Sequence, residues 1–245
     1  RLQCDVDTDL QTLCRELTQN PTFAKLPKER VLIELEKGWL KSVEPQIATQ
    51  WMENLQALQH YIPNLSKLSD EQWQQTHNRI AYAGSKRQHL DIGHSMGLFW
   101  ALLTFELSDP DRTDIFERLH IERFHGFPIR RSFDDLDTYV AHALRNPSRI
   151  VQNLIGEHVR PAFIYDVAEC VELGQSTFVF ENRNQSIKRD LLTTPLPRIV
   201  TGKDLLQLGL RGATLGAWME RIRNEQLNER IQSKEDALSW VKENI

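Results

Sequence analysis

The chain has 245 residues, which is enough for one large domain or for two to three small modules with cores of their own. Its 40% apolar and 26% charged residues are ordinary for a soluble globular protein, and a net charge of −4 does not by itself indicate a nucleic-acid partner. The longest apolar run, residues 96–103, is far shorter than the ~20 residues that span a membrane, so the sequence predicts no membrane association.

Helical periodicity dominates the chain from one end to the other, because apolar residues recur every three or four positions. We predict helices over residues 8–17, 27–40, 46–58, 70–83, 91–107, 112–123, 136–144, 148–173, 203–208, 215–231 and 234–241. The strongest signal for extended structure lies at residues 177–180. Since one four-residue strand cannot form a sheet, the sequence predicts an all-α fold. Breaks between groups of helices are expected at residues 61–64, 127–128 and 194–197, where prolines disfavour helix.

Three cysteines, Cys4, Cys14 and Cys170, are too few and too widely spaced for a disulfide framework or a C-x-x-C pair. We therefore expect reduced cysteines, a cytoplasmic location and no disulfide-linked partner. Cys170 lies within an apolar helix and is expected in the core rather than as a nucleophile. No signal peptide is visible, and the first residue is Arg1 rather than Met, so we expect the chain to be part of a longer protein.

Positive charge is concentrated in one segment. Residues 183–223 carry eight Lys or Arg residues and three acidic residues, a local charge of about +5 in a chain whose total is −4. The remainder is therefore strongly acidic. A local basic block of this kind indicates a polyanionic partner, although an ordinary solvated surface would also account for it.

Patterns typical of an active site are weak. His77, His89, Asp91 and His94 lie within eighteen residues, but residues two apart on a helix point in different directions, so a shared metal site is disfavoured. The acidic pairs Asp5/Asp7, Asp109/Asp111 and Asp134/Asp135 lie at turns or helix starts, where Asp is expected as a cap. No carboxylate pair follows a glycine-rich phosphate loop. The sequence thus predicts neither a catalytic residue nor a metal site in this chain.

Residues 200–223 differ from these weak patterns, because they combine glycines at positions 209, 212 and 216 with four Lys or Arg residues. Thr201 is expected to cap a short helix containing Lys203, and Gly209 to end that helix in the left-handed conformation. Gly212 and Gly216 would let the next helix start close to another backbone. Seven apolar residues, Leu205, Leu206, Leu208, Leu215, Trp218, Met219 and Ile222, are expected to pack the two helices together. The free N–H groups at the second helix start, with Thr214 as a capping hydroxyl and Arg211 beside it, would suit a phosphate group; the alternative is an ordinary tight turn.

The same segment carries a resemblance to a known family. The run Thr201-Gly202-Lys203-Asp204-Leu205-Leu206-x-Leu208-Gly209, followed by Gly212-x-x-x-Gly216, resembles the C-terminal tail of bacterial class II tRNA nucleotidyltransferases, the CCA-adding enzymes, and of the related poly(A) polymerases. This sequence has Arg211-Gly212-Ala213-Thr214 where the family has P-G-P. Near the other end, Leu26-Pro27-Lys28-Glu29-Arg30-Val31-x-x-Glu34-Leu35 is similar to the family's neck motif, with Pro27 in place of a serine.

The resemblance implies an elongated arrangement of helical modules: a partial neck over residues 1–62, a body over 63–173 and a tRNA-binding tail over 174–245. Glu29, Arg30 and Glu34 would brace the neck. The tail would contact the phosphate backbone of the tRNA acceptor and TΨC arms through Thr201, Lys203, Gly209, Arg211, Gly212, Thr214, Gly216, Arg221 and Arg223.

The family's catalytic head precedes the neck, and neither its G-[SG]-x-R-D phosphate loop nor its E-D-x-x-R template motif occurs here. This chain would therefore hold no cofactor and be inactive alone, while the head of the parent enzyme would use Mg²⁺ with CTP and ATP to add CMP and AMP to tRNA 3′ ends. Two alternatives stay open: the same portion of a bacterial poly(A) polymerase, and a helix-hairpin-helix DNA-binding module. The sequence does not distinguish addition of CC, A, CCA or poly(A).

Overall fold

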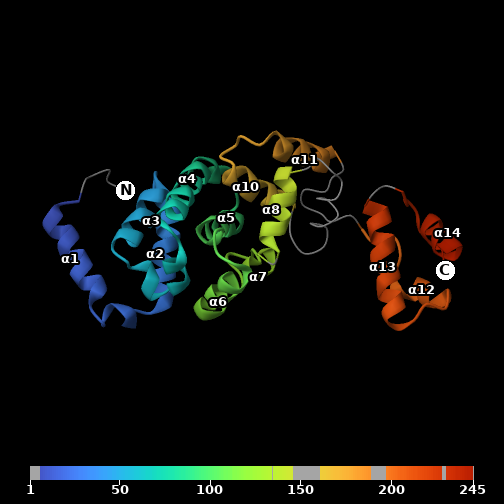
Figure 1. The fold of residues 1–245 in the computed structure, drawn as a ribbon, viewed down its shortest axis with the longest axis horizontal. Helices are drawn as coiled ribbons and strands as arrows, with labels where there is room; N and C mark the ends of the chain where they lie inside the picture. Colours follow the sequence, from blue (N-terminus) through green and yellow to red (C-terminus); the bar gives the residue numbers. More distant parts are fainter. Residues whose placement is uncertain (1–5, 134, 146–160, 189–196, 228–229, 245) are drawn as a thin grey trace. The chain divides into compact units, whose positions relative to one another are not determined.

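The computed structural model describes residues 6–133, 135–145, 161–188, 197–227 and 230–244 (Figure 1). Within these ranges the structure is built from helices, and the only extended pairing recorded in them is an isolated bridge between Phe124 and Phe127. The all-α fold predicted from the sequence is confirmed. The α-helices are α1 (Thr8–Gln19), α2 (Lys28–Lys41), α3 (Pro45–Asn54), α4 (Asp70–Lys86), α5 (Ile92–Thr104), α6 (Asp109–Leu119), α7 (Ile129–Ser132), α8 (Leu136–Arg145), α10 (Pro161–Val171), α11 (Thr177–Lys188), α12 (Gly202–Gln207), α13 (Gly212–Leu227) and α14 (Lys234–Asn244).

Most helix ends differ from their predicted positions by a few residues. The helix predicted over 46–58 is wrong at its end, because α3 stops at Asn54 and Gln56 adopts a left-handed conformation with φ 54°. Leu58 instead begins a short 3-10 helix, η2 (Leu58–His60). Of the helix predicted over 148–173, residues 148–160 lie outside the described part of the chain, and the remainder corresponds to α10. Residues 194–196 of the predicted proline break also lie outside it.

The extended signal at residues 177–180 does not correspond to a strand, because these residues form the first turn of α11. The β-branched and aromatic side chains there favour a strand only when a neighbouring strand is available to pair with. Helical spacing instead buries Val179 and Asn182, three positions apart, on one side of α11. Asn182 Nδ2 donates a hydrogen bond to Ala143 O at 3.2 Å, which ties α11 to α8.

The chain divides into two compact units, one made of Arg1–Asp137 with Asp166–Ser176 and the other of Thr138–Tyr165 with Thr177–Ile245. In the first unit, α2, α3 and α4 pack side by side, and both α2 and α4 contact α5 (Figure 1). Helix α5 is buried from Gly93 to Thr104 because its sequence is apolar on every side. Trp39 of α2 packs on Phe99 and donates a hydrogen bond from Nε1 to Ser95 Oγ at 2.9 Å, which fixes α2 against α5.

Helix α1 turns its apolar face outward. Leu10, Leu13 and Leu17 are 50%, 50% and 56% exposed. On the polar side, Thr18 is buried and donates a hydrogen bond from Oγ1 to Leu55 O at 2.8 Å. An apolar stripe on a surface helix normally faces the core. In α1, by contrast, it is the polar side that meets the rest of the first unit.

None of the helices in the described ranges combines the length and the apolar character needed to cross a membrane.

Candidate nucleic-acid interface

The last three helices form a small module with its own core, which we call the tail module (residues 197–227 and 230–244). Helix α13 contacts both α12 and α14 (Figure 1). The buried side chains of its core are Val200, Leu205, Leu210, Trp218, Ile222, Ile231, Ala237 and Val241, with Leu208, Leu215 and Met219 among the partly buried residues around them. Six of the seven predicted packing residues are therefore confirmed. The prediction for the seventh residue, Leu206, is wrong, because its side chain is 50% exposed.

The start of α12 is stabilised from within the module. Thr201 donates hydrogen bonds from its backbone N–H and from Oγ1 to Asp204 Oδ2, at 2.8 and 2.7 Å. Asp204 Oδ1 lies 2.5 Å from Lys234 Nζ, at the first residue of α14. The Lys234 ammonium, and after it the Thr201 groups, lower the pKa of Asp204 to about 2. Thr201 therefore lies at the predicted helix start, but a phosphate at its hydroxyl would compete with the Asp204 carboxylate.

Helix α12 ends in a left-handed glycine, as the sequence predicted. Gly209 has φ +87°, in the left-handed region that glycine enters at little cost. Its N–H donates to Leu206 O at 3.0 Å, and the next residue, Leu210, donates to Leu205 O at 3.2 Å. This pair of bonds is a Schellman motif, and the burial of both Leu205 and Leu210 supplies the hydrophobic contact that usually accompanies it. The motif directs the chain from α12 into Arg211 and α13.

The start of α13 differs from its predicted position. The helix begins at Gly212, so Thr214 lies inside its first turn and is not the residue that caps it. Gly212, with φ +57°, supplies the left-handed conformation at this point, and Arg211 precedes it. The predicted close approach of Gly212 and Gly216 to another backbone is also wrong within this chain, because a Cβ added at either would meet no atom of the described structure within 4 Å.

Both glycines therefore lie on an open face of α13. Ala213 and Ala217 are exposed as well, and residues three and four apart lie on the same side of a helix. The four small residues form a smooth surface along the first two turns, which we call the small-residue face (Gly212, Ala213, Gly216 and Ala217). A partner could reach the α13 backbone there more closely than over ordinary side chains.

Two of the predicted basic residues lie on opposite edges of this face. Arg221 and Arg223 are two positions apart, so their side chains leave the helix about 200° from each other. The Arg221 guanidinium lies over the Trp218 ring, 4.1 Å from its centroid. Arg223 Nη1 donates to Gln226 Oε1 at 3.0 Å, and Gln226 Nε2 donates in turn to Pro197 O at 2.6 Å. Lys203 and Arg211 are both exposed.

The residues of the predicted neck motif lie on α2, in the first unit. Helix α2 begins directly after Pro27, and Glu29, Arg30 and Glu34 are all exposed on it. Glu34 Oε1 lies 2.7 Å from Lys37 Nζ. The apolar positions of the same helix, Leu35 and Trp39, are buried.

The weak metal and catalytic patterns correspond to separate structural contacts. His77 is buried and stacks on Trp73, and burial lowers its pKa to about 4. His94 Nε2 lies 2.9 Å from Asp166 Oδ2, while Asp91 accepts the backbone N–H of His94 as the N-cap of α5. Among the described side chains, no group of three or more His, Cys, Asp or Glu residues is placed to hold a metal ion. Cys170 is buried in the core, as predicted.

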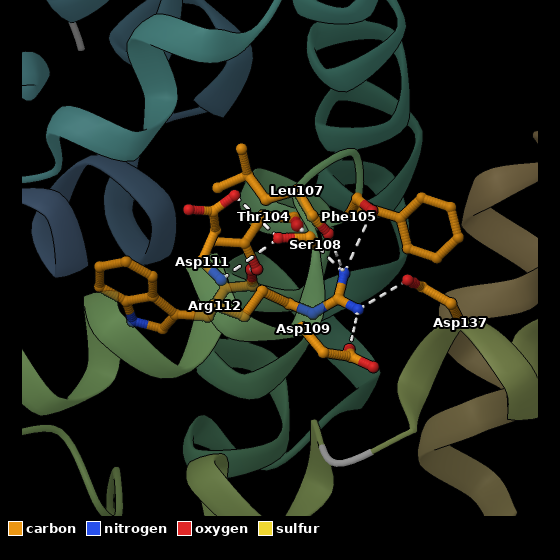
Figure 2. Close-up of polar contacts among 9 residues, drawn as sticks. Thr104, Phe105, Leu107, Ser108, Asp109, Asp111, Arg112 and Asp137 are labelled. Carbon is orange, nitrogen blue, oxygen red and sulfur yellow. Dashed lines mark hydrogen bonds and ion pairs between the residues drawn. The ribbon is translucent and has the colours of Figure 1, made fainter.

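One buried charged residue was missed by the sequence interpretation. Arg112 of α6 is 1% exposed, and its guanidinium donates hydrogen bonds to the carbonyls of Thr104, Phe105 and Leu107, at 3.3, 3.2 and 2.8 Å (Figure 2). It also pairs with Asp109 and, at 2.7 Å, with Asp137 Oδ2. Burial opposes the charged form, but the bonds to Asp137 and Asp109 outweigh it and raise the pKa of Arg112.

Arg112 thus joins the C-terminal end of α5 to α6 and to the start of α8. The sequence signal that could have indicated this is a cation on α6 a few residues after the end of the apolar α5, since basic side chains commonly bind the last carbonyls of a helix.

Comparison with protein-family models, curated proteins and solved structures gave no match to this chain.

Proposed function

We propose that this chain is the helical, RNA-binding portion of a tRNA nucleotidyltransferase of the CCA-adding type, and that its tail module binds the phosphate backbone of the tRNA acceptor and TΨC arms. The observation that carries the proposal is the small-residue face of α13, exposed beside Arg211 and directly after the Schellman turn at Gly209. The resemblance of this segment to the family's tail, and of Leu26–Leu35 to the family's neck, supports it.

The chemistry of the face suits a phosphodiester backbone. The first N–H groups of a helix lack partners within the helix and carry partial positive charge, and α13 is long enough for its dipole to contribute. Exposed Arg211 and Lys203 would add full positive charges. With no side chain at Gly212 and Gly216, a sugar-phosphate chain could approach these donors directly. Contacts of this kind recognise shape and charge and carry no base sequence information.

Gly216 offers the cleanest test, because its backbone conformation is an ordinary helical one and the space beside it is open. Gly216→Leu places a bulky but helix-compatible side chain on the small-residue face without straining the backbone. We expect it to weaken tRNA binding by tenfold or more, about 1.4 kcal/mol. The matched control is Ser239→Leu, which adds the same side chain at an exposed position of α14. Both variants and the wild-type chain would be titrated with tRNA in a fluorescence anisotropy assay.

Salt titration of the same complexes measures the electrostatic part of binding. Lys203→Ala and Arg211→Ala should each reduce the steepness of the salt dependence by roughly one counterion. Arg30→Ala should leave it unchanged, because Arg30 lies on α2. If Gly216→Leu binds tRNA as tightly as the wild type, or if Arg30→Ala alone flattens the salt slope, the RNA-binding surface lies elsewhere on the chain.

In the parent enzyme, transfer of CMP and AMP from CTP and ATP with Mg²⁺ would belong to the catalytic head, and this chain would position the tRNA in the cytoplasm. A poly(A) polymerase parent would use the same tail surface with other RNA 3′ ends. A helix-hairpin-helix module would instead bind duplex DNA. Equal affinity for a DNA duplex and for tRNA at the same salt concentration would favour that class over ours.

A further inference from the structure

Arg221 lies against two tryptophans. Its guanidinium carbon lies 4.1 Å from the centroid of the Trp218 ring on α13 and 5.4 Å from that of Trp240 on α14. The two indoles meet edge to face, with centroids 5.6 Å apart and planes at 75°. Trp218 is buried and Trp240 partly buried, whereas Arg221 is exposed. The aromatic pair is thus fixed in the core of the tail module and presents the guanidinium at its surface.

The charge of Arg221 is not neutralised by its own helix. The acidic residue one turn further along α13, Glu225, is the expected partner at spacing i, i+4. Glu225 instead pairs with Arg230, whose Nη1 lies 3.1 Å from Glu225 Oε2. In the part of the tail module that the structure describes, no carboxylate lies within ion-pair distance of Arg221.

We propose that Trp218 and Trp240 position Arg221 as a phosphate-binding group, so that the RNA-binding surface extends from the start of α13 along the same helix to Arg221. This inference rests on the proposed function and assigns α14 a role in it. Arg221 lies seven residues after Thr214, on the same edge of α13 and about 10 Å further along its axis. The site would bind a second phosphate group of the same tRNA backbone.

Stacking explains why an arginine suits this position. A guanidinium lying against an aromatic ring keeps its edge N–H groups directed outward, and these match the oxygens of a phosphate in a bidentate arrangement. The rings also restrict the side chain before binding, so less conformational entropy is lost when a phosphate is bound. A lysine carries the same charge but lacks the planar group that stacks and bonds in this way.

Four variants of the full chain separate charge from position, with tRNA affinity measured as a function of salt. Arg221→Gln removes the charge and should reduce the salt slope by roughly one counterion. Arg221→Lys and Trp240→Leu keep the positive charge at residue 221, so the salt slope should stay the same. Both lose stacking between residues 221 and 240, so they should weaken binding about two- to fivefold. Trp240→Phe retains an aromatic ring and should recover most of the loss. Lys242→Gln, at an exposed position of α14, serves as the charge control.

A spectroscopic readout reports the position of Arg221 without RNA. The Nε–Hε resonance of Arg221 should be displaced by the ring currents of the two indoles, and Trp240→Leu should move it toward the value of an unstacked arginine. Thermal unfolding of each variant would test whether the tail module remains folded.

These experiments distinguish three ways in which the inference can fail. If the wild-type chain binds tRNA but Arg221→Gln leaves affinity and slope unchanged, Arg221 is not a phosphate-binding group. If Arg221→Gln weakens binding while Trp240→Leu leaves both affinity and resonance unchanged, the positioning role of Trp240 is wrong. If the wild-type chain does not bind tRNA even at low salt, the proposed function and this inference both fail.

Discussion

Asp204 and Lys234 join the first turn of α12 to the first residue of α14, with Oδ1 and Nζ 2.5 Å apart. Asp204 also accepts two hydrogen bonds from Thr201. A single carboxylate therefore holds the start of one helix and links it to another, in a module whose hydrophobic core is small.

We expect this link to make the tail module sensitive to acid. Lys234, followed by Thr201, lowers the pKa of Asp204 from 3.8 to about 2 in the folded chain. A lowered pKa means that the unfolded chain binds the proton more readily, so the contribution of Asp204 is complete above about pH 4 and is lost as the pH falls toward 2. We expect the fluorescence of Trp218 and Trp240 to report loosening of the module over that range.

Lys234→Gln should weaken this acid dependence, because it removes the largest cause of the lowered pKa. Lys242→Gln, at the other end of α14, is the control and should leave it unchanged. An acid transition of the tail module that is the same in wild type and Lys234→Gln would contradict the assignment.

The buried guanidinium of Arg112 should be one of the more important polar groups of the first unit. Arg112→Ala would leave three backbone carbonyls, at the end of α5 and in the connection that follows it, without their donor and break the pairs with Asp109 and Asp137. We expect the free energy of unfolding to fall by about 3–5 kcal/mol, as measured by urea denaturation. Arg118→Ala removes an exposed pair with Asp114 on the same helix and should cost about 0.3–0.5 kcal/mol. Similar losses for the two variants would show that Arg112 is not the anchor that its contacts indicate.

Gly93 near the start of α5 should tolerate no side chain. A Cβ added there would lie 2.8 Å from Phe124 O and 3.0 Å from His125 O, and these backbone atoms cannot move aside easily. We expect Gly93→Ala to lower the free energy of unfolding by about 1–3 kcal/mol. The matched variant Gly216→Ala adds the same methyl group in open space within a helix and should raise stability by about 0.5–1 kcal/mol. Equal effects of the two changes would contradict the close approach at Gly93.

Because the apolar face of α1 points outward, replacing one of its leucines should cost little stability, unlike replacing a leucine of the core. Leu13→Gln should change the free energy of unfolding by less than about 0.5 kcal/mol, because half of the side chain is already exposed. Thr18→Val, on the polar side, should cost about 1 kcal/mol through the loss of its hydrogen bond to Leu55 O. Chemical denaturation of both variants tests this, and a larger loss for Leu13→Gln than for Thr18→Val would mean that the leucine face is covered in the folded chain.

The sequence predicted those parts of the fold and of the candidate site that depend on neighbouring residues. The left-handed turn at Gly209 follows from the absence of a side chain, and the start of α2 after Pro27 follows from the fixed φ of proline. The apolar spacing of α13 was sufficient to identify Trp218 and Ile222 as core residues. In each case the information lies within one or two helical turns of the residue concerned.

Only the tertiary structure decided features that depend on residues distant in the sequence. Residues 177–180 have strand propensity, yet they form a helix because Asn182 and Val179 pack against other elements. The burial of Arg112 depends on Asp137 and on the end of α5, neither of which its own helix reveals. Likewise, the Trp240 ring that contacts Arg221 comes from another helix, and the open space beside Gly216 depends on which elements do not cover it. Short-range spacing specifies helices and turns, whereas the exposure and partners of each side chain are set by how the helices pack.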